Sequence, residues 1–166
     1  MSLLNLDEFR RTPLAQDPFP FAVVRKFVAA AAMPAILRDF PKIDQGGSFP
    51  LASLEYGADF RSLCEALRGP EMQAAFAEKF GLDLSHRPTT LTVRGRCRTK
   101  DGQIHVDSKS KLITVLVYLN ALDESPGAGG QLRILRSGHD IQNYVAQVPP
   151  EPGTMLCLLN GPHAWH

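Results

Sequence analysis

The chain has 166 residues, enough for one domain with an apolar core and too few for two. Hydrophobic residues make up 44% of the sequence and charged residues 21%, values that are typical of globular proteins and that exclude a disordered chain. The formal net charge is +1, from 18 Lys and Arg against 17 Asp and Glu, which argues against a protein that holds nucleic acid through bulk charge.

Cysteine usage and hydropathy favour the cytoplasm. The chain has three cysteines, an odd number without a C-x-x-C spacing: Cys64, Cys97 and Cys157. A disulfide framework is therefore not expected, and a reducing compartment is the simpler setting. The most apolar stretch, residues 27–37, is 11 residues long and too short to span a bilayer, and the N-terminus lacks the apolar run of a signal peptide. The sequence predicts a soluble, cytoplasmic single domain over residues 1–166, without membrane contact.

Helical signals dominate the first half of the chain. An alanine-rich segment predicts a helix over residues 27–40, kinked at Pro34. A second helix is predicted over residues 59–68, where apolar residues recur at i, i+3, i+4 and i+7: Phe60, Leu63, Cys64 and Leu67. A third is predicted over residues 70–81, with a proline in its first turn and a glycine at its end. The helical part of the chain is thus expected over about residues 20–85.

From Pro88 onward the pattern changes to short strands between turns. Six strands are predicted, over residues 90–98, 103–107, 111–119, 131–135, 144–148 and 154–159. Asp101 and Gly102 form a strong hairpin signal between the first two of these strands. Helices followed by hairpin-linked strands predict an α+β chain whose second half is an antiparallel sandwich or jelly roll.

The candidate site begins with His105 and Asp107. Residues i and i+2 of a strand point to the same face, so this imidazole and this carboxylate converge. A late histidine, His163 or His166, would complete a triad of two histidines and one carboxylate on one side of a metal ion. Such a triad leaves the other octahedral positions open, as non-haem Fe(II) oxygen chemistry requires. An H-x-D also occurs by chance in proteins that bind no metal, so the pair alone is a weak signal.

Further pieces follow the H-x-D in a specific order. They are a strand that ends in Tyr118-Leu119-Asn120, a G-G-x-L strand at residues 129–132, a Pro-Gly turn before Thr154, and the final histidine. In that order and spacing, the second half of the chain resembles the Fe(II)/2-oxoglutarate-dependent oxygenases, particularly the branch that includes the prolyl hydroxylases.

The resemblance implies a fold and a reaction. The fold is a double-stranded β-helix (jelly roll) over about residues 88–166, with the N-terminal helices packed on it as support. The reaction is hydroxylation of a small-molecule or peptide substrate, coupled to decarboxylation of 2-oxoglutarate to succinate. Neither nucleic acid nor a membrane is implied as a partner.

The resemblance also implies roles for individual residues. His105, Asp107 and His166 would be the iron ligands and catalytic residues, and His166 is favoured over His163 because it directly follows a tryptophan, as the family's ligand often does. Tyr118 matches the position whose hydroxyl often contacts 2-oxoglutarate. A core tyrosine with its hydroxyl bonded to the backbone is the alternative for that residue.

One departure from the family concerns the co-substrate. An Arg or Lys beyond the last histidine usually clamps the 2-oxoglutarate carboxylate, whereas this sequence stops at His166 and shows six of the eight expected strands. We therefore expect the last strands of the jelly roll to lie outside these residues. If the hairpin forms, Arg96 lies opposite Asp107 and Arg98 opposite His105. Arg96 is then the candidate co-substrate contact, with a solvated cationic strand edge as the alternative.

Two other classes of protein compete with the oxygenase. A jelly-roll module that binds a sugar or an acidic ligand would need neither the last histidine nor a co-substrate. A cupin-like metal enzyme would use a similar barrel, but cupins usually carry an H-x-H in their first motif where this chain has an H-x-D. Release of succinate that depends on Fe(II) and oxygen discriminates the oxygenase from both.

Overall fold

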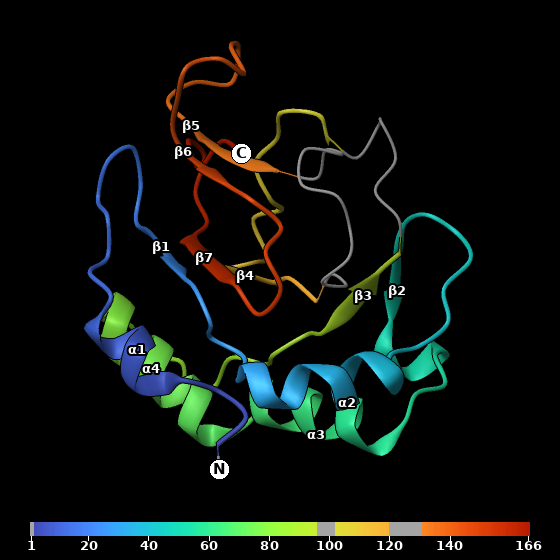
Figure 1. Cartoon of the computed structure of the whole chain (residues 1–166). Coiled ribbons are helices and arrows are strands. Elements are labelled where there is room, and N and C mark those ends of the chain that lie inside the picture. The colour runs from blue at the N-terminus through green and yellow to red at the C-terminus, as the bar shows by residue number, and fades with distance from the viewer. Residues whose placement is uncertain (1, 96–101, 120–130) are drawn as a thin grey trace.

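Helices and strands form separate layers, with the four α-helices on one side of the strands (Figure 1). The structure is a computed structural model that describes residues 2–95, 102–119 and 131–166. The helices are α1 (Leu6–Arg11), α2 (Met33–Arg38), α3 (Ala58–Leu67) and α4 (Pro70–Phe80), with short 3-10 turns at Ala30–Ala32 and Leu51–Ser53. The strands are β1 (Phe21–Val24), β2 (Ser48–Pro50), β3 (Thr92–Arg94), β4 (Ile113–Val117), β5 (Leu132–Leu135), β6 (Tyr144–Val148) and β7 (Met155–Leu159).

The two helices α3 and α4 confirm the sequence prediction for residues 59–68 and 70–81. In α3 the predicted apolar stripe is buried at Phe60, Leu63 and Cys64. Helix α4 starts at a proline and ends at Gly81, whose φ of 65° is the left-handed conformation that glycine adopts without strain. None of the helices in the described ranges is long and apolar enough to cross a membrane.

The helix predicted over residues 27–40 is wrong in its first part. Phe27 and Val28 are buried in extended backbone, and the Val28 N–H donates to the Gly153 carbonyl at 3.1 Å. Pro34 does not kink a helix; it lies in the first turn of α2, where its missing N–H costs no hydrogen bond. Contacts with distant parts of the chain therefore outweigh the helical preference of residues 27–29.

Strand β7 is the centre of a three-stranded antiparallel sheet in the order β1-β7-β4. Because side chains alternate along a strand, its two faces contribute to two different apolar clusters. Met155 and Cys157 belong to the first cluster, which lies between the sheet and the helices. Leu156 and Leu158 belong to the second cluster, together with residues of β5 and β6. The site described below lies on the side of the second cluster.

Two further antiparallel pairs, β2-β3 and β5-β6, accompany this sheet. The predicted strands at 111–119, 131–135, 144–148 and 154–159 are confirmed with slightly shorter bounds in three cases. The first half was predicted as helical, and the strands β1 and β2 within it were not predicted. Residues 103–107 form no regular strand, although His105 pairs with the chain end as described below.

The chain is thus a mixed α/β protein with antiparallel sheets. The strands of the described ranges do not close into a single barrel. The predicted hairpin turn at Asp101 and the end of the predicted strand 90–98 lie outside the described residues.

Candidate metal centre

His105 and His166 are brought together by their backbones. The His105 N–H donates to the His166 carbonyl at 3.1 Å, and the His166 N–H donates back to the His105 carbonyl at 3.0 Å. Two residues that exchange both backbone hydrogen bonds are directly opposed, as in an antiparallel ladder. One residue earlier, the Trp165 carbonyl accepts from the Leu135 N–H at the end of β5. The last residues therefore lie between β5 and the H-x-D segment.

Packing fixes this last segment as well as hydrogen bonding. Ala164 is buried in the second apolar cluster, and its N–H donates to the Gly161 carbonyl at 3.2 Å. The ring of Trp165 packs so closely over Gly138 that a Cβ at position 138 would lie 2.8 Å from it. Glycine at that position is therefore what allows the indole, and the histidine after it, to take their places.

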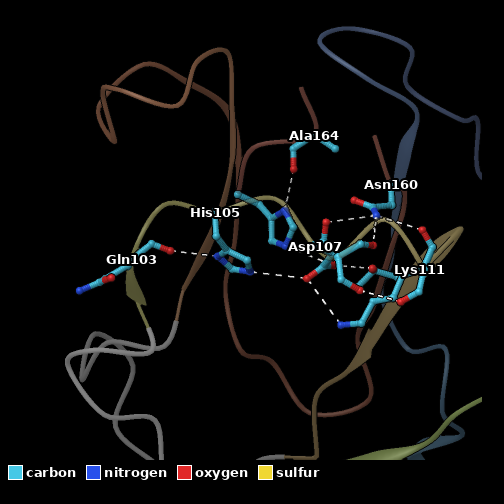
Figure 2. A network of polar contacts seen from close by, with 10 residues as sticks. Gln103, His105, Asp107, Lys111, Asn160 and Ala164 are labelled. Carbon is cyan, nitrogen blue, oxygen red and sulfur yellow. Dashed lines mark hydrogen bonds and ion pairs between the residues drawn. The ribbon is translucent and has the colours of Figure 1, made fainter. Parts of the chain in front are cut away.

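The carboxylate of Asp107 lies beside both imidazoles, whose ring centroids are 4.4 Å apart. Its Oδ1 is 3.7 Å from Nε2 of His105, and its Oδ2 is 3.7 Å from Nε2 of His166. Figure 2 shows His105 and Asp107 pointing toward each other from one segment of chain. One ligand atom from each of the three residues can be chosen so that all lie within 4.8 Å of one another. The structure thus brings together the three ligands that the sequence predicts.

Both histidines present the same ring nitrogen to the carboxylate. Nδ1 of His105 lies 3.0 Å from the Gln103 carbonyl, and Nδ1 of His166 lies 2.9 Å from the Ala164 carbonyl (Figure 2). A carbonyl accepts only, so Nδ1 carries the proton and Nε2 keeps its lone pair in the neutral ring. This arrangement is typical of metal-binding histidines, whose other nitrogen is held by a backbone carbonyl or a carboxylate.

The two histidines differ in exposure. The His105 side chain is 47% exposed, whereas the His166 side chain is 3% exposed. Burial is the largest cause that lowers the pKa of His166 below its ordinary value, and it outweighs the Ala164 carbonyl and the Asp107 carboxylate, which act in the opposite direction. His166 therefore remains a neutral ligand at lower pH than an exposed histidine would.

The carboxylate of Asp107 is held in its charged form. Burial alone would raise the pKa of Asp107, because its side chain is only 11% exposed. The hydrogen bond that Thr114 Oγ1 donates to Oδ2, together with the positive charge of neighbouring groups, outweighs burial and lowers this pKa. One of those groups is Lys111, whose Nζ lies 3.6 Å from Oδ1.

The geometry suits a transition-metal ion. Imidazole and carboxylate ligands bind such ions at about 2.1 Å, so two ligands at right angles lie about 3 Å apart. The two separations of 3.7 Å between carboxylate and imidazole atoms are close to that value. Two neutral imidazoles and one carboxylate are the ligand set of non-haem iron sites with open positions. These three residues could therefore hold a transition-metal ion.

The other predicted site residues lie apart from this group. His163 is exposed and is not a member of the cluster, which favours His166 as the third ligand. Tyr118 follows β4 on the same strand face as Thr114, about 13 Å further along at strand spacing. It packs against the second apolar cluster. Arg96 and Arg98 lie outside the described residues.

Two residues of the site were not singled out from the sequence. Thr114 bonds the Asp107 carboxylate, and Asn160 bonds the backbone of the loop after it. Thr114 shares its strand face with Leu116 and Tyr118, so a polar residue on an otherwise apolar face was the available signal. Asn160 follows an apolar strand and precedes Gly161 and Pro162, and this pattern looks like an ordinary turn.

Comparisons with protein-family models, with curated proteins and with solved structures find no match to this chain.

Proposed function

We propose that the chain is a non-haem iron, 2-oxoglutarate-dependent oxygenase in which His105, Asp107 and His166 hold Fe(II). The observation that carries this proposal is that one ligand atom from each of the three residues can be chosen so that all lie within 4.8 Å of one another, while backbone carbonyls orient both imidazole rings. A chance H-x-D has no reason to meet a buried histidine from a segment about 60 residues away in this way.

The proposed metal centre would have one side closed to solvent and one side open to it. His166 and Asp107 are largely buried and would shield the ion from water on one side. His105 is about half exposed, so a substrate would approach from its side. When bound, Fe(II) would supply the oxidation in which O₂ delivers one oxygen atom to the substrate as a hydroxyl and one to succinate, with release of CO₂ from 2-oxoglutarate.

The jelly roll is part of the same proposal. The β1-β7-β4 sheet and the β5-β6 pair are both antiparallel, and residues of both meet in the second apolar cluster. Two antiparallel sheets that face each other across an apolar layer are the basic arrangement of a jelly roll. The triad would then lie at one end of the space between the sheets.

We propose Tyr118 as a contact for 2-oxoglutarate, at the other end of that space. Its backbone N–H donates to the Thr154 carbonyl at 2.9 Å, so the two residues are neighbours. Thr154 is 2% exposed, and its hydroxyl oxygen has no hydrogen-bond partner among the described residues. A buried hydroxyl beside Tyr118 supports a polar ligand at this place. Arg96 remains a second proposed contact.

We further propose a small-molecule or peptide substrate and a cytoplasmic setting. The near-neutral charge of +1 gives no support to nucleic acid as a partner. Cys64 and Cys157 are buried free thiols, which suits a reducing compartment.

The test is succinate release. The chain is incubated with Fe(II), 2-oxoglutarate, ascorbate and air, and succinate is measured by mass spectrometry with and without each component. We expect release that requires both Fe(II) and oxygen. Asp107→Ala should abolish both tight metal binding and succinate release while circular dichroism stays unchanged. The matched control is His163→Ala, which removes the histidine outside the cluster and should keep both activities.

Three outcomes would contradict the proposal. Tight metal binding by the three ligands without succinate release would favour the cupin-like metal protein instead. Full metal occupancy in the Asp107→Ala variant would contradict the ligand assignment itself, because other residues would then hold the ion. A parent chain that binds no metal would favour the jelly-roll binding module.

A further inference from the structure

Asn160 ties the loop after Asp107 to the end of β7. Its Nδ2 donates to the carbonyl of Ser108 at 2.7 Å and to that of Lys111 at 2.9 Å, with a longer contact of 3.4 Å to that of Asp107 (Figure 2). Its backbone N–H donates to the Leu112 carbonyl at 2.9 Å. A single residue thus contacts the segment from residue 107 to residue 112 at both ends and in between.

The orientation of the Asn160 amide shows which of its atoms matters. If the amide were flipped, its oxygen would face three carbonyl oxygens, so the hydrogen-bond network assigns the N–H₂ group to that side. The oxygen, Oδ1, is then buried with no donor among the described residues. A buried acceptor without a donor disfavours folding. The hydrogen bonds that Nδ2 donates therefore hold the side chain in place, although burying Oδ1 without a donor disfavours this position.

The loop has few other restraints. Residues 108–110 are exposed and belong to neither a helix nor a strand. Within the loop, the Lys111 N–H donates to the Ser108 carbonyl at 3.0 Å, and the hydroxyl oxygens of Ser108 and Ser110 lie 2.8 Å apart. Thr114 holds the carboxylate of Asp107, but it does not hold the loop backbone. Asn160 is the contact that connects this backbone to the sheet.

We propose that Asn160 is a positioning residue for the metal ligand Asp107. By fixing the backbone from residue 107 to residue 112, it sets the distance between the carboxylate and the two imidazoles. This inference rests on the proposed metal centre. Groups that orient metal ligands typically change metal affinity by about 10- to 100-fold when removed.

The experiment measures Co²⁺ binding by the whole chain, through visible absorption and calorimetry. Asn160→Leu keeps the number and branching of the side-chain heavy atoms and removes the donors, and Asn160→Ala removes both. We expect both variants to bind Co²⁺ about 10-fold more weakly than the parent chain and to shift the absorption bands of the bound ion. If Asn160 only fills space, Asn160→Leu will bind like the parent. The matched control is Asn143→Leu, an exposed asparagine in the loop before β6, which should leave affinity unchanged.

A double-mutant cycle separates positioning from a general effect on the fold. In the Asp107→Ala background, the residual Co²⁺ binding comes from the two histidines, so Asn160→Leu should weaken it no further. An equal loss in both backgrounds would overturn the proposal. The proposal would also be overturned if Asn160→Leu bound Co²⁺ like the parent chain while Asp107→Ala bound it weakly. The proposed metal centre would not be contradicted by that result. Absence of Co²⁺ binding by the parent chain would instead overturn the proposed function, and this inference with it.

Discussion

The two faces of the β1-β7-β4 sheet have different tasks, and β7 contributes to both. On one face, Met155 and Cys157 pack into the large apolar cluster under the helices. On the other face, Leu156 and Leu158 pack toward β5 and β6, and Asn160, which follows the strand, donates to the loop after Asp107. Both faces therefore bury apolar side chains, and the face toward β5 and β6 also carries the polar cluster.

This comparison implies that stability and metal binding can be changed separately. Substitutions under the helices should lower the free energy of unfolding and leave the ligand geometry of the folded protein unchanged. Substitutions around Asp107 should act on metal affinity with little effect on unfolding.

Phe9→Ala should give the largest effect on the helix side. Phe9 in α1 is fully buried and packs against Phe76 of α4 with ring centroids 4.8 Å apart. Removing such a ring costs about 3–5 kcal/mol of unfolding free energy. Urea denaturation followed by circular dichroism measures this loss. The Co²⁺ affinity of the protein that stays folded should be unchanged, and a parallel loss of affinity would show that the two faces are not independent.

Acid should destabilise the protein in part through His166. Burial lowers the pKa of this histidine in the fold, so between that lowered value and the ordinary value of about 6.5 the unfolded chain binds a proton that the folded chain does not. The contribution of the neutral His166 to the free energy of unfolding is fully present above about pH 6.5 and is lost as the pH falls below this value. Urea denaturation of the metal-free chain at pH 7.5 and 5.5 measures the difference.

His166→Gln should make this pH dependence smaller, because glutamine does not titrate. The matched control is His163→Gln, which removes an exposed histidine three residues earlier and should preserve the pH dependence of the parent. An identical pH dependence in His166→Gln and in the parent chain would contradict the role of the buried imidazole.

Lys111→Met should have a smaller effect, and it should raise the affinity for Co²⁺ instead of weakening it. The ammonium of Lys111 lies 3.6 Å from Oδ1 of Asp107, where it competes with a metal ion for the same carboxylate. Because the lysine side chain is 55% exposed, water screens this repulsion, and we expect affinity for Co²⁺ to rise by about 3- to 10-fold. Lys109→Met is the control, since Lys109 lies in the same exposed loop. An equal rise in both variants would indicate a general charge effect.

Local sequence signals were sufficient for several parts of the molecule. The periodic stripe of α3 and the proline and glycine that bound α4 lie within the elements themselves. The pairing of His105 with Asp107 is also local, because only one residue separates them. These predictions needed no knowledge of distant contacts, and the structure agrees with them.

Elements that depend on distant contacts were predicted poorly. Strand β1 has an apolar run without alternation, and it forms by pairing with β7, where Ala22 lies opposite Cys157. The extended backbone at Val28 is likewise stabilised by a hydrogen bond to Gly153. The role of Asn160 depends on a loop about 50 residues earlier in the chain. No local pattern in the sequence contains these long-range contacts. The sequence therefore indicates the candidate ligands better than it indicates the residues that position them.

The close packing of Trp165 on Gly138 has a practical consequence. Trp165 is the only tryptophan of the chain, and the residue after it is the buried His166, a proposed metal ligand. Its intrinsic fluorescence therefore originates next to the triad, where an open-shell ion such as Co²⁺ would quench the emission. The protein carries a built-in optical reporter, and occupancy of the centre can be followed by emission without any added label.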